Sequence, residues 1–150
     1  MCIKILFTFL LTHKFLVMIK IPKGISKEEV YQRRAIIIDK LQHLIGTSVR
    51  CKALKNQLVH FDFYSIDETA THASKKYEST LAALNVTKAI SNAKKIGLDR
   101  AKSNRQKKLG FVIIVELSAE VKNVGEVKII IGRKANKQYL HYCITKKIAD

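Results

Sequence analysis

The sequence predicts an α+β fold in which N-terminal helices pack on an antiparallel β-sheet. Helix-type spacing of apolar residues dominates residues 26–97, apart from strand-like alternation over residues 48–64. Strand-like segments then follow one another over residues 109–145 with short connections, which favours an antiparallel meander. A chain of 150 residues that is 47% hydrophobic can bury a core, and we expect one domain over residues 18–150.

Residues 1–17 are expected to form an extension to this domain. A basic residue and the apolar run at residues 5–11 resemble the start of a signal peptide, but His13 and Lys14 interrupt it and no small-residue cleavage site follows. The run is also too short to cross a bilayer. Met18 would be a natural start for the domain. The extension is therefore interpreted as the product of an upstream start codon or as an accessory strand or helix, with secretion the weaker interpretation.

The clearest helix lies over residues 26–46. Ser26 and Glu29 form a capping-box pair at its start, and Gly46 suits a left-handed C-terminal cap. Its polar face is expected to be solvated and includes Arg33, Arg34 and His43. The expected buried stripe consists of Val30, Ile37, Ile38, Leu41, Leu44 and Ile45.

A β-hairpin is expected over residues 48–64. Val59, Phe61 and Phe63 alternate with polar residues, and the segment KNQ supplies the turn. His60 falls on the outer side of this hairpin, where a solvated or hydrogen-bonded imidazole is the ordinary outcome.

Two more helices are expected over residues 65–85 and 86–97. His72 and Lys76 are one turn apart in the first of them, which places both on a polar face together with Lys75 and Ser79. The expected buried residues of the two helices are Ala70, Ala73, Tyr77, Leu81, Leu84, Val86, Ala89, Ile90 and Ala93.

The most basic stretch of the chain covers residues 94–108, where Asp99 is the only acidic residue. It has no apolar periodicity, so we expect a solvated, mobile loop that attracts a phosphate backbone. Its basic residues are Lys94, Lys95, Arg100, Lys102, Arg105, Lys107 and Lys108.

Three strands are expected over residues 109–117, 125–131 and 138–145. The first is apolar on both faces except for Glu116, as is typical of a central strand covered on both sides. In the second, Lys128 falls on the face opposite to the apolar row.

Composition narrows the class of partner. The formal net charge is +16, from 28 Lys and Arg against 12 Asp and Glu, which favours a polyanion such as RNA or another nucleic acid. A basic surface also serves solubility or an anionic membrane, but nothing else in the sequence indicates a membrane partner. Three scattered cysteines and five histidines without ligand spacing predict neither disulfides nor a metal site. We therefore expect a cytoplasmic protein without metal or other cofactors.

Strand alternation predicts a cluster of polar residues on the sheet. If the faces of the three strands coincide, Glu116, Lys128 and His141 lie side by side, and Tyr139 offers a ring on which a base can stack. Arg133, near the turn before the last strand, is assigned to nucleic-acid binding with Tyr139. A carboxylate, a cation and an imidazole can supply the base, the charge stabilisation and the acid of RNA cleavage. The same residues would also make an ordinary ion-paired surface.

The order of these elements resembles the barnase–EndoU–colicin–RelE-like nuclease fold, in the form found in polyvalent proteins of phages and mobile elements. The similar segments are HASKKY, ALNVTKAISNA, FVIIVEL, GEVKIIIG and QYLHYCIT, within residues 65–148. The resemblance implies RNA cleavage without a metal, with His72 and Lys76 on a helix and Glu116, Lys128 and His141 on the sheet.

The resemblance also implies a toxin-like module, for which an immunity or antitoxin protein is a candidate partner. Two departures favour a member that binds without cleaving: Lys128 stands where Arg is more usual, and Cys143 occupies a row expected to be polar. Three hypotheses result: a metal-independent endoribonuclease-like domain, a non-catalytic nucleic-acid-binding domain, and a structural or interaction protein whose charge keeps it soluble.

Overall fold

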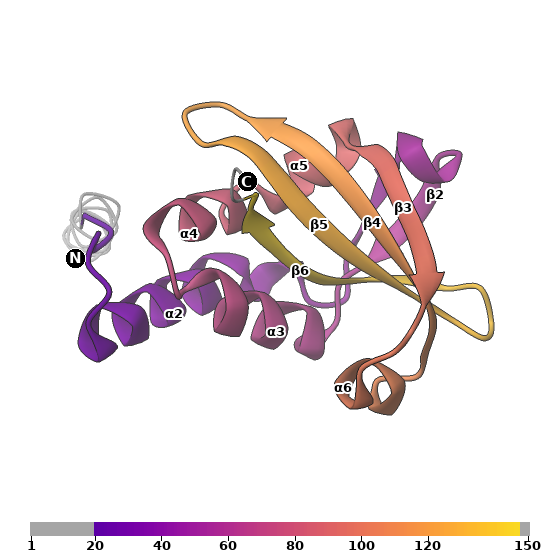
Figure 1. Cartoon of the computed structure of the whole chain (residues 1–150), viewed down its shortest axis with the longest axis horizontal. Helices are drawn as coiled ribbons and strands as arrows, with labels where there is room; N and C mark the ends of the chain where they lie inside the picture. The colour runs from indigo at the N-terminus through magenta and orange to yellow at the C-terminus, as the bar shows by residue number, and fades with distance from the viewer. Residues whose placement is uncertain (1–19, 148–150) are drawn as a thin grey trace, which may run out of the picture.

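The computed structural model describes residues 20–147, which form helices beside a six-stranded sheet (Figure 1). The expected extension over residues 1–17 and the start at Met18 lie outside this range, so those predictions stay predictions. Within the described range, no helix combines the length and the apolar character needed to span a membrane.

The helices and strands alternate less simply than expected, although the α+β class is confirmed. The α-helices are α2 (Lys27–Leu41), α3 (Phe63–Ala73), α4 (Tyr77–Ala83), α5 (Val86–Asn92) and α6 (Asn104–Lys108), with short 3-10 turns η1 (Gln42–Leu44) and η2 (Lys52–Leu54). The strands are β1 (Ser48–Cys51), β2 (Gln57–His60), β3 (Lys94–Arg100), β4 (Phe111–Val121), β5 (Gly125–Lys134) and β6 (Tyr139–Lys146).

The sheet has the order β1-β2-β6-β5-β4-β3. The hairpin of β1 and β2 and the meander of β4, β5 and β6 are antiparallel, as predicted. The two units join through β2 and β6, and that pairing is parallel, so the expectation of a wholly antiparallel sheet is wrong. The hairpin between β5 and β6 fixes the direction of β6. In that direction β6 runs parallel to β2.

The first helix packs largely as its stripe predicts. Ile37, Leu41 and Leu44 are buried, whereas Ile45 is exposed just before the left-handed Gly46. Ser26 and Glu29 make the predicted N-terminal cap.

Arg33 is the exception on this helix, because the expected solvated guanidinium is fully buried. It donates to the carbonyl oxygens of Pro22, Gly24 and Ser74 at 2.6–2.8 Å and to that of Lys75 at 3.3 Å. A buried charge is tolerated only where such hydrogen bonds replace water. Arg33 therefore ties the segment before α2 to the turn between α3 and α4.

The helix expected over residues 65–85 is in fact two helices, α3 and α4. α3 begins earlier than predicted, because Asp62 and Ser65 form a capping box: the Asp62 carboxylate accepts from the Ser65 N–H, and the Ser65 hydroxyl accepts from the Asp62 N–H. Phe63, expected to point inward from a strand, is instead exposed in the first turn of α3.

The break between α3 and α4 leaves main-chain carbonyls without helical partners. Arg33 donates to two of them, the carbonyls of Ser74 and Lys75. The Thr80 hydroxyl adds bonds to the Ala73 and Lys76 carbonyls, which also accept from backbone N–H groups. Lys76 consequently sits at the cap position of α4, and the shared helical face expected for His72 and Lys76 does not form. The buried residues of α4 are Ser79, Thr80, Ala82 and Ala83, not the predicted Tyr77 and Leu81.

The basic segment over residues 94–108 is not the expected loop. It forms the edge strand β3 and the short helix α6. β3 pairs with β4 through its backbone, and nearly all of its side chains are exposed. Because the strand has no buried row of side chains, its sequence shows no apolar periodicity.

The sheet has two faces of different character. Its inner face, against which the helices pack, carries the main core, with Val115, Leu117, Ile129 and Ile131 fully buried. Its outer face carries a smaller cluster near α6, made of Ala101, Phe111, Leu140, Tyr142 and Cys143. In Figure 1, α3 lies alongside β6, and α6 hangs below the ends of β3 and β4.

Candidate functional site

Two of the three residues expected to form a catalytic group on the sheet lie together on the outer face. The Lys128 Nζ is 3.3 Å from the Glu116 Oε1, and both side chains are partly exposed. His141 does not join them, because it lies on the inner face with only 1% of its surface exposed. The prediction that His141 lies beside Glu116 and Lys128 is therefore wrong.

A β-bulge explains the error. Ile130 pairs with Cys143 and Ile131 pairs with His141, so Tyr142 is an extra residue in β6. Side chains alternate between the two faces of the sheet on either side of a bulge, but the alternation shifts by one residue across it. The bulge directs His141 toward α3, and Tyr142 and Cys143 belong to the outer cluster.

His141 lies in a largely apolar setting. Its Nδ1 is 3.4 Å from the Thr69 hydroxyl, and its ring centroid is 5.3 Å from that of Phe61. Its Nε2 has no hydrogen-bond partner among residues 20–147. Burial lowers the pKa of His141 to about 3, against a smaller opposing effect of the Cys143 backbone, so the imidazole is neutral at physiological pH.

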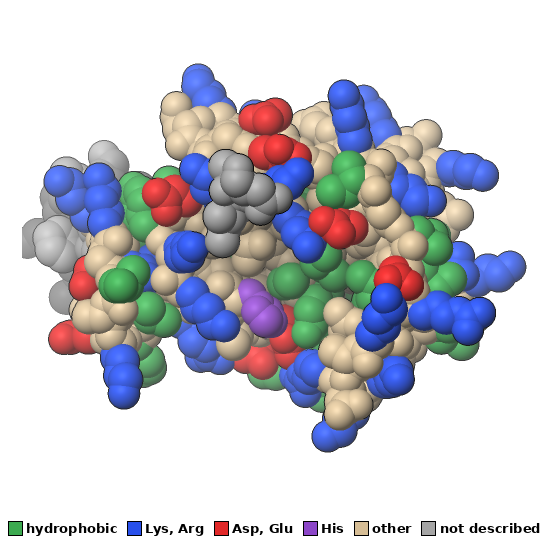
Figure 2. Space-filling view, in the orientation of Figure 1, with side chains coloured by type: hydrophobic (Ala, Val, Ile, Leu, Met, Phe, Trp, Pro, Cys, Tyr) green, Lys and Arg blue, Asp and Glu red, His purple; other side chains and the backbone are tan. Residues whose placement is uncertain are grey.

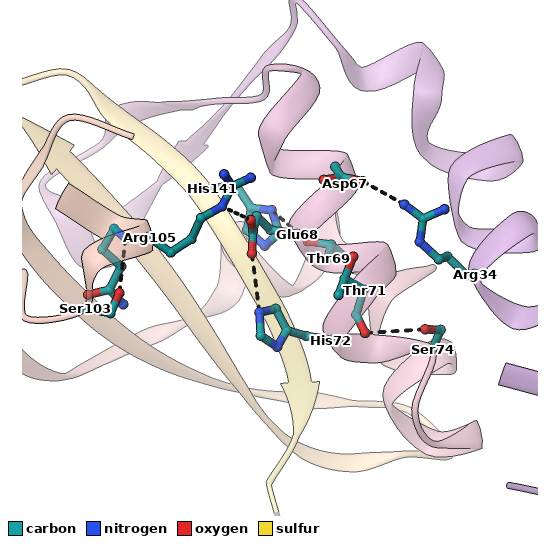
Figure 3. Close-up of polar contacts among 11 residues, drawn as sticks. Arg34, Asp67, Glu68, Thr69, Thr71, His72, Ser74, Ser103, Arg105 and His141 are labelled. Atoms are coloured by element: carbon teal, nitrogen blue, oxygen red, sulfur yellow. Dashed lines mark hydrogen bonds and ion pairs between the residues drawn. The ribbon is translucent and has the colours of Figure 1, made fainter. Parts of the chain in front are cut away.

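A different group of polar side chains meets where α3, α6 and β6 converge (Figure 3). Glu68 Oε2 is 3.3 Å from His72 Nε2, one turn along α3, and Glu68 Oε1 accepts from Arg105 Nε of α6 at 2.5 Å. The His72 ring lies 6.1 Å from that of Tyr142, and the Arg105 guanidinium lies 5.6 Å from the centre of the Tyr64 ring. We call Glu68, His72, Arg105 and Tyr142 the Glu68 cluster.

The negative charge of Glu68 contributes to the raised pKa of three nearby groups, Arg105, Tyr142 and Cys143. Its hydrogen bond and charge raise the pKa of Arg105, so the guanidinium stays protonated. Burial, reinforced by Glu68, raises the pKa of Tyr142 to about 12. Burial and Glu68 likewise raise the pKa of Cys143 to about 12, and Lys128 opposes them. The Cys143 thiol is therefore protonated at physiological pH.

Exposure separates the members of the cluster by role. The Glu68 side chain is 9% exposed, whereas those of His72 and Arg105 are 38% and 46% exposed. A ligand can therefore reach the imidazole and the guanidinium, while the carboxylate holds both of them in place.

The residues assigned to nucleic-acid binding are spread more widely than the cluster. Lys102 is paired with Asp99 at 2.7 Å. Tyr139 is half-buried and packs against the main core from the inner face, and its expected role as a stacking platform stays a prediction. The remaining basic residues are exposed on β3 and α6 or partly exposed on β5: Lys94, Lys95, Arg100, Lys107, Lys108 and Arg133. Lys76, assigned to catalysis, is exposed at the start of α4.

Sequence reasoning missed two members of the cluster. Glu68 lies four residues before His72, a helical spacing at which side chains meet, so this pair was within reach of the pattern. By strand alternation Tyr142 shares a row with Leu140 and Ile144, which indicates no functional role, and the bulge shifts it out of that row to where its ring lies near His72. Arg105 was predicted as a basic residue without its partner.

The distribution of charge on this side of the molecule is visible in Figure 2, where Lys and Arg side chains ring the face and a histidine lies near its middle. Over residues 20–147, no three His, Cys, Asp or Glu side chains gather in a way that would hold a metal ion.

No protein-family model, curated protein or solved structure matches the chain. The resemblance to the nuclease fold therefore remains an expectation from short sequence segments.

Proposed function

We propose that the protein binds RNA through its basic surface and cleaves it at the Glu68 cluster. The observation that carries the proposal is the position of Glu68, which holds the exposed imidazole of His72 on one oxygen and the exposed guanidinium of Arg105 on the other. The excess of 28 basic over 12 acidic residues supports a polyanionic substrate.

The proposed reaction uses the substrate's own 2′-hydroxyl as nucleophile. His72 accepts the hydroxyl proton, and the carboxylate of Glu68 stabilises the imidazolium that results. Arg105 donates to the phosphate oxygens as negative charge builds on them. The 2′-oxygen bonds to phosphorus and the bond to the 5′-oxygen breaks. The departing oxygen takes a proton from water, and the hydroxide that remains takes the proton held by the His72 imidazolium. The products are a 2′,3′-cyclic phosphate and a free 5′-hydroxyl.

Cleavage of a labelled RNA panel tests this chemistry. Positioned acid–base groups typically contribute about 10²–10⁴-fold, so His72→Gln and Glu68→Gln should each lower the cleavage rate by that order. His43→Gln is the control, because His43 is exposed on η1 away from the cluster. Chelation should change nothing, and RNA with 2′-deoxy substitutions should survive. Equal activity of the His72→Gln and parent proteins would refute the proposed site.

Binding is tested separately from cleavage. Phosphate contacts release counterions, so affinity for single-stranded RNA should fall steeply with salt and depend little on sequence. Lys107→Glu with Lys108→Glu should weaken binding more than the control pair Lys52→Glu with Lys55→Glu on η2, which changes the charge equally. An affinity for RNA that does not change with salt concentration would rule out both nucleic-acid functions, with cleavage and without it.

A second candidate is a nucleic-acid-binding domain that does not cleave. The observation that favours it is that both oxygens of Glu68 are occupied by protein partners, as in a purely structural ion-pair network. Salt-dependent RNA binding without cleavage of any RNA in the panel would select this alternative.

A further inference from the structure

A cavity of about 150 Å³ lies next to the Glu68 cluster. Tyr64 and Ser65 of α3 form one wall, and Phe111 of β4 with His141 and Tyr142 of β6 form another. Lys108 and Lys134 also line it, from the end of α6 and the end of β5. The cavity therefore combines three aromatic rings, one imidazole and two cations.

His141 gives this cavity an unusual property. The side chain is almost completely buried, it lines the cavity, and its Nε2 has no partner among the described residues. A buried polar nitrogen without a hydrogen bond costs about 1–3 kcal/mol, and native proteins rarely leave one. A ligand with a hydrogen-bonding edge would supply the missing partner after a small side-chain shift that uncovers Nε2.

The rest of the lining indicates what kind of ligand this is. Phe111 and Tyr142 pack edge to face on each other with centroids 6.0 Å apart, and together they give the cavity an apolar aromatic wall. Lys108 and Lys134 supply positive charge, and the Asp62 carboxylate adds an acceptor for an N–H group. A nucleotide has this combination of features: a flat base with polar edges joined to an anionic phosphate.

The size of the cavity selects among nucleotides. An apolar cavity of about 150 Å³ is known to hold benzene, a single six-membered ring. The cavity here has a similar volume, which accommodates one six-membered ring, whereas the second ring of a purine would have to extend from its open side.

We propose that this cavity binds the base of a pyrimidine nucleotide, with His141 Nε2 hydrogen-bonded to the base edge and the phosphate held by Lys108 and Lys134. The proposal rests on the proposed function in that it names a substrate residue for the adjacent Glu68 cluster. Tyr142 belongs to both, so a base in the cavity places its own ribose and phosphate toward that cluster.

Calorimetric titration of the full chain with UMP, CMP, AMP and GMP at low salt tests the proposal. UMP or CMP should bind at least tenfold more tightly than either purine nucleotide. His141→Phe retains a flat ring but removes both nitrogens, and it should weaken pyrimidine binding about tenfold, as expected for one lost hydrogen bond.

A surface variant keeps the test decisive if His141→Phe does not fold. Lys108→Gln with Lys134→Gln should weaken UMP binding at least tenfold, whereas Lys52→Gln with Lys122→Gln, exposed and away from the cavity, should change it little. Equal affinity for purines and pyrimidines, absence of nucleotide binding, or equal loss in the two double variants would each overturn the proposal.

The outcome is distinguishable from failure of the proposed cleavage. UMP binding by a protein that cuts no RNA would leave the pyrimidine site standing and remove the catalytic role of the Glu68 cluster. RNA cleavage by a protein that binds no mononucleotide would remove the pyrimidine site and leave the catalytic role of the Glu68 cluster standing.

Discussion

Part of the destabilisation of this protein by acid should come from His141. Its pKa is about 3 in the folded protein because it is buried, and the ordinary value is 6.5. Below pH 6.5 the unfolded chain therefore takes up a proton that the folded protein does not. The stabilisation is complete above pH 6.5 and is lost progressively as the pH falls toward 3.

The two pKa values set the magnitude. Their difference of about 3.5 corresponds to a total of about 5 kcal/mol, at about 1.36 kcal/mol for each pKa unit. At pH 5 the linkage relation gives a loss of about 2 kcal/mol relative to neutral pH. Such a loss is a substantial fraction of the stability of an ordinary domain.

Urea unfolding followed by circular dichroism, at a series of pH values from 7.5 to about 4.5, measures this effect. The two variants His141→Phe and His141→Gln remove the titrating group and differ in polarity. Both should lose about 2 kcal/mol less than the parent between neutral pH and pH 5, whatever their absolute stabilities. Comparison with the parent cancels the contributions of carboxylates that all three proteins share. Two variants that keep the parent's acid dependence would refute the burial of a neutral His141.

Two further predictions concern stability, again measured by urea unfolding. Arg33→Met leaves four carbonyls without their donor and should lower the free energy of unfolding by on the order of 3 kcal/mol. The control Arg34→Met removes a partly exposed ion pair with Asp67 and should lower it by under about 1 kcal/mol. Similar losses in both variants would contradict the structural role of Arg33. Gly132→Ala places a methyl group in steric conflict with the Phe111 ring and should cost about 1–3 kcal/mol. The control Gly97→Ala meets only ordinary contacts at 3.7 Å, and a Gly132→Ala protein as stable as this control would show that Phe111 can yield.

Local chemistry was enough to predict much of the fold. The cap at Ser26 and Glu29 and the buried Ile37 and Leu41 follow from contacts within one or two helical turns, which the sequence displays directly. The inward row of β5 follows from alternation in the same way. The pair of Glu116 and Lys128 also met as expected, because both lie on strands whose alternation is undisturbed between them.

Only the tertiary structure decided the environment of the polar residues. Arg33 looks solvated on a helical wheel, and it is buried because main-chain carbonyls from distant segments converge on it. His141 looks outward by alternation, and one extra residue in β6 turns it into the core. The bulge depends on how β6 packs between β5 and α3. No residue type within the strand indicates its presence or position.

The same reason governs the candidate site. Glu68 and His72 are neighbours on one helix, so their contact was implicit in the sequence. Arg105 and Tyr142 reach them from segments 37 and 74 residues from Glu68 along the chain, and short-range patterns carry no information about such distances. The sequence determined which residues carry charge and which faces are apolar, and the packing of α3 against β6 and α6 determined which of those charges meet.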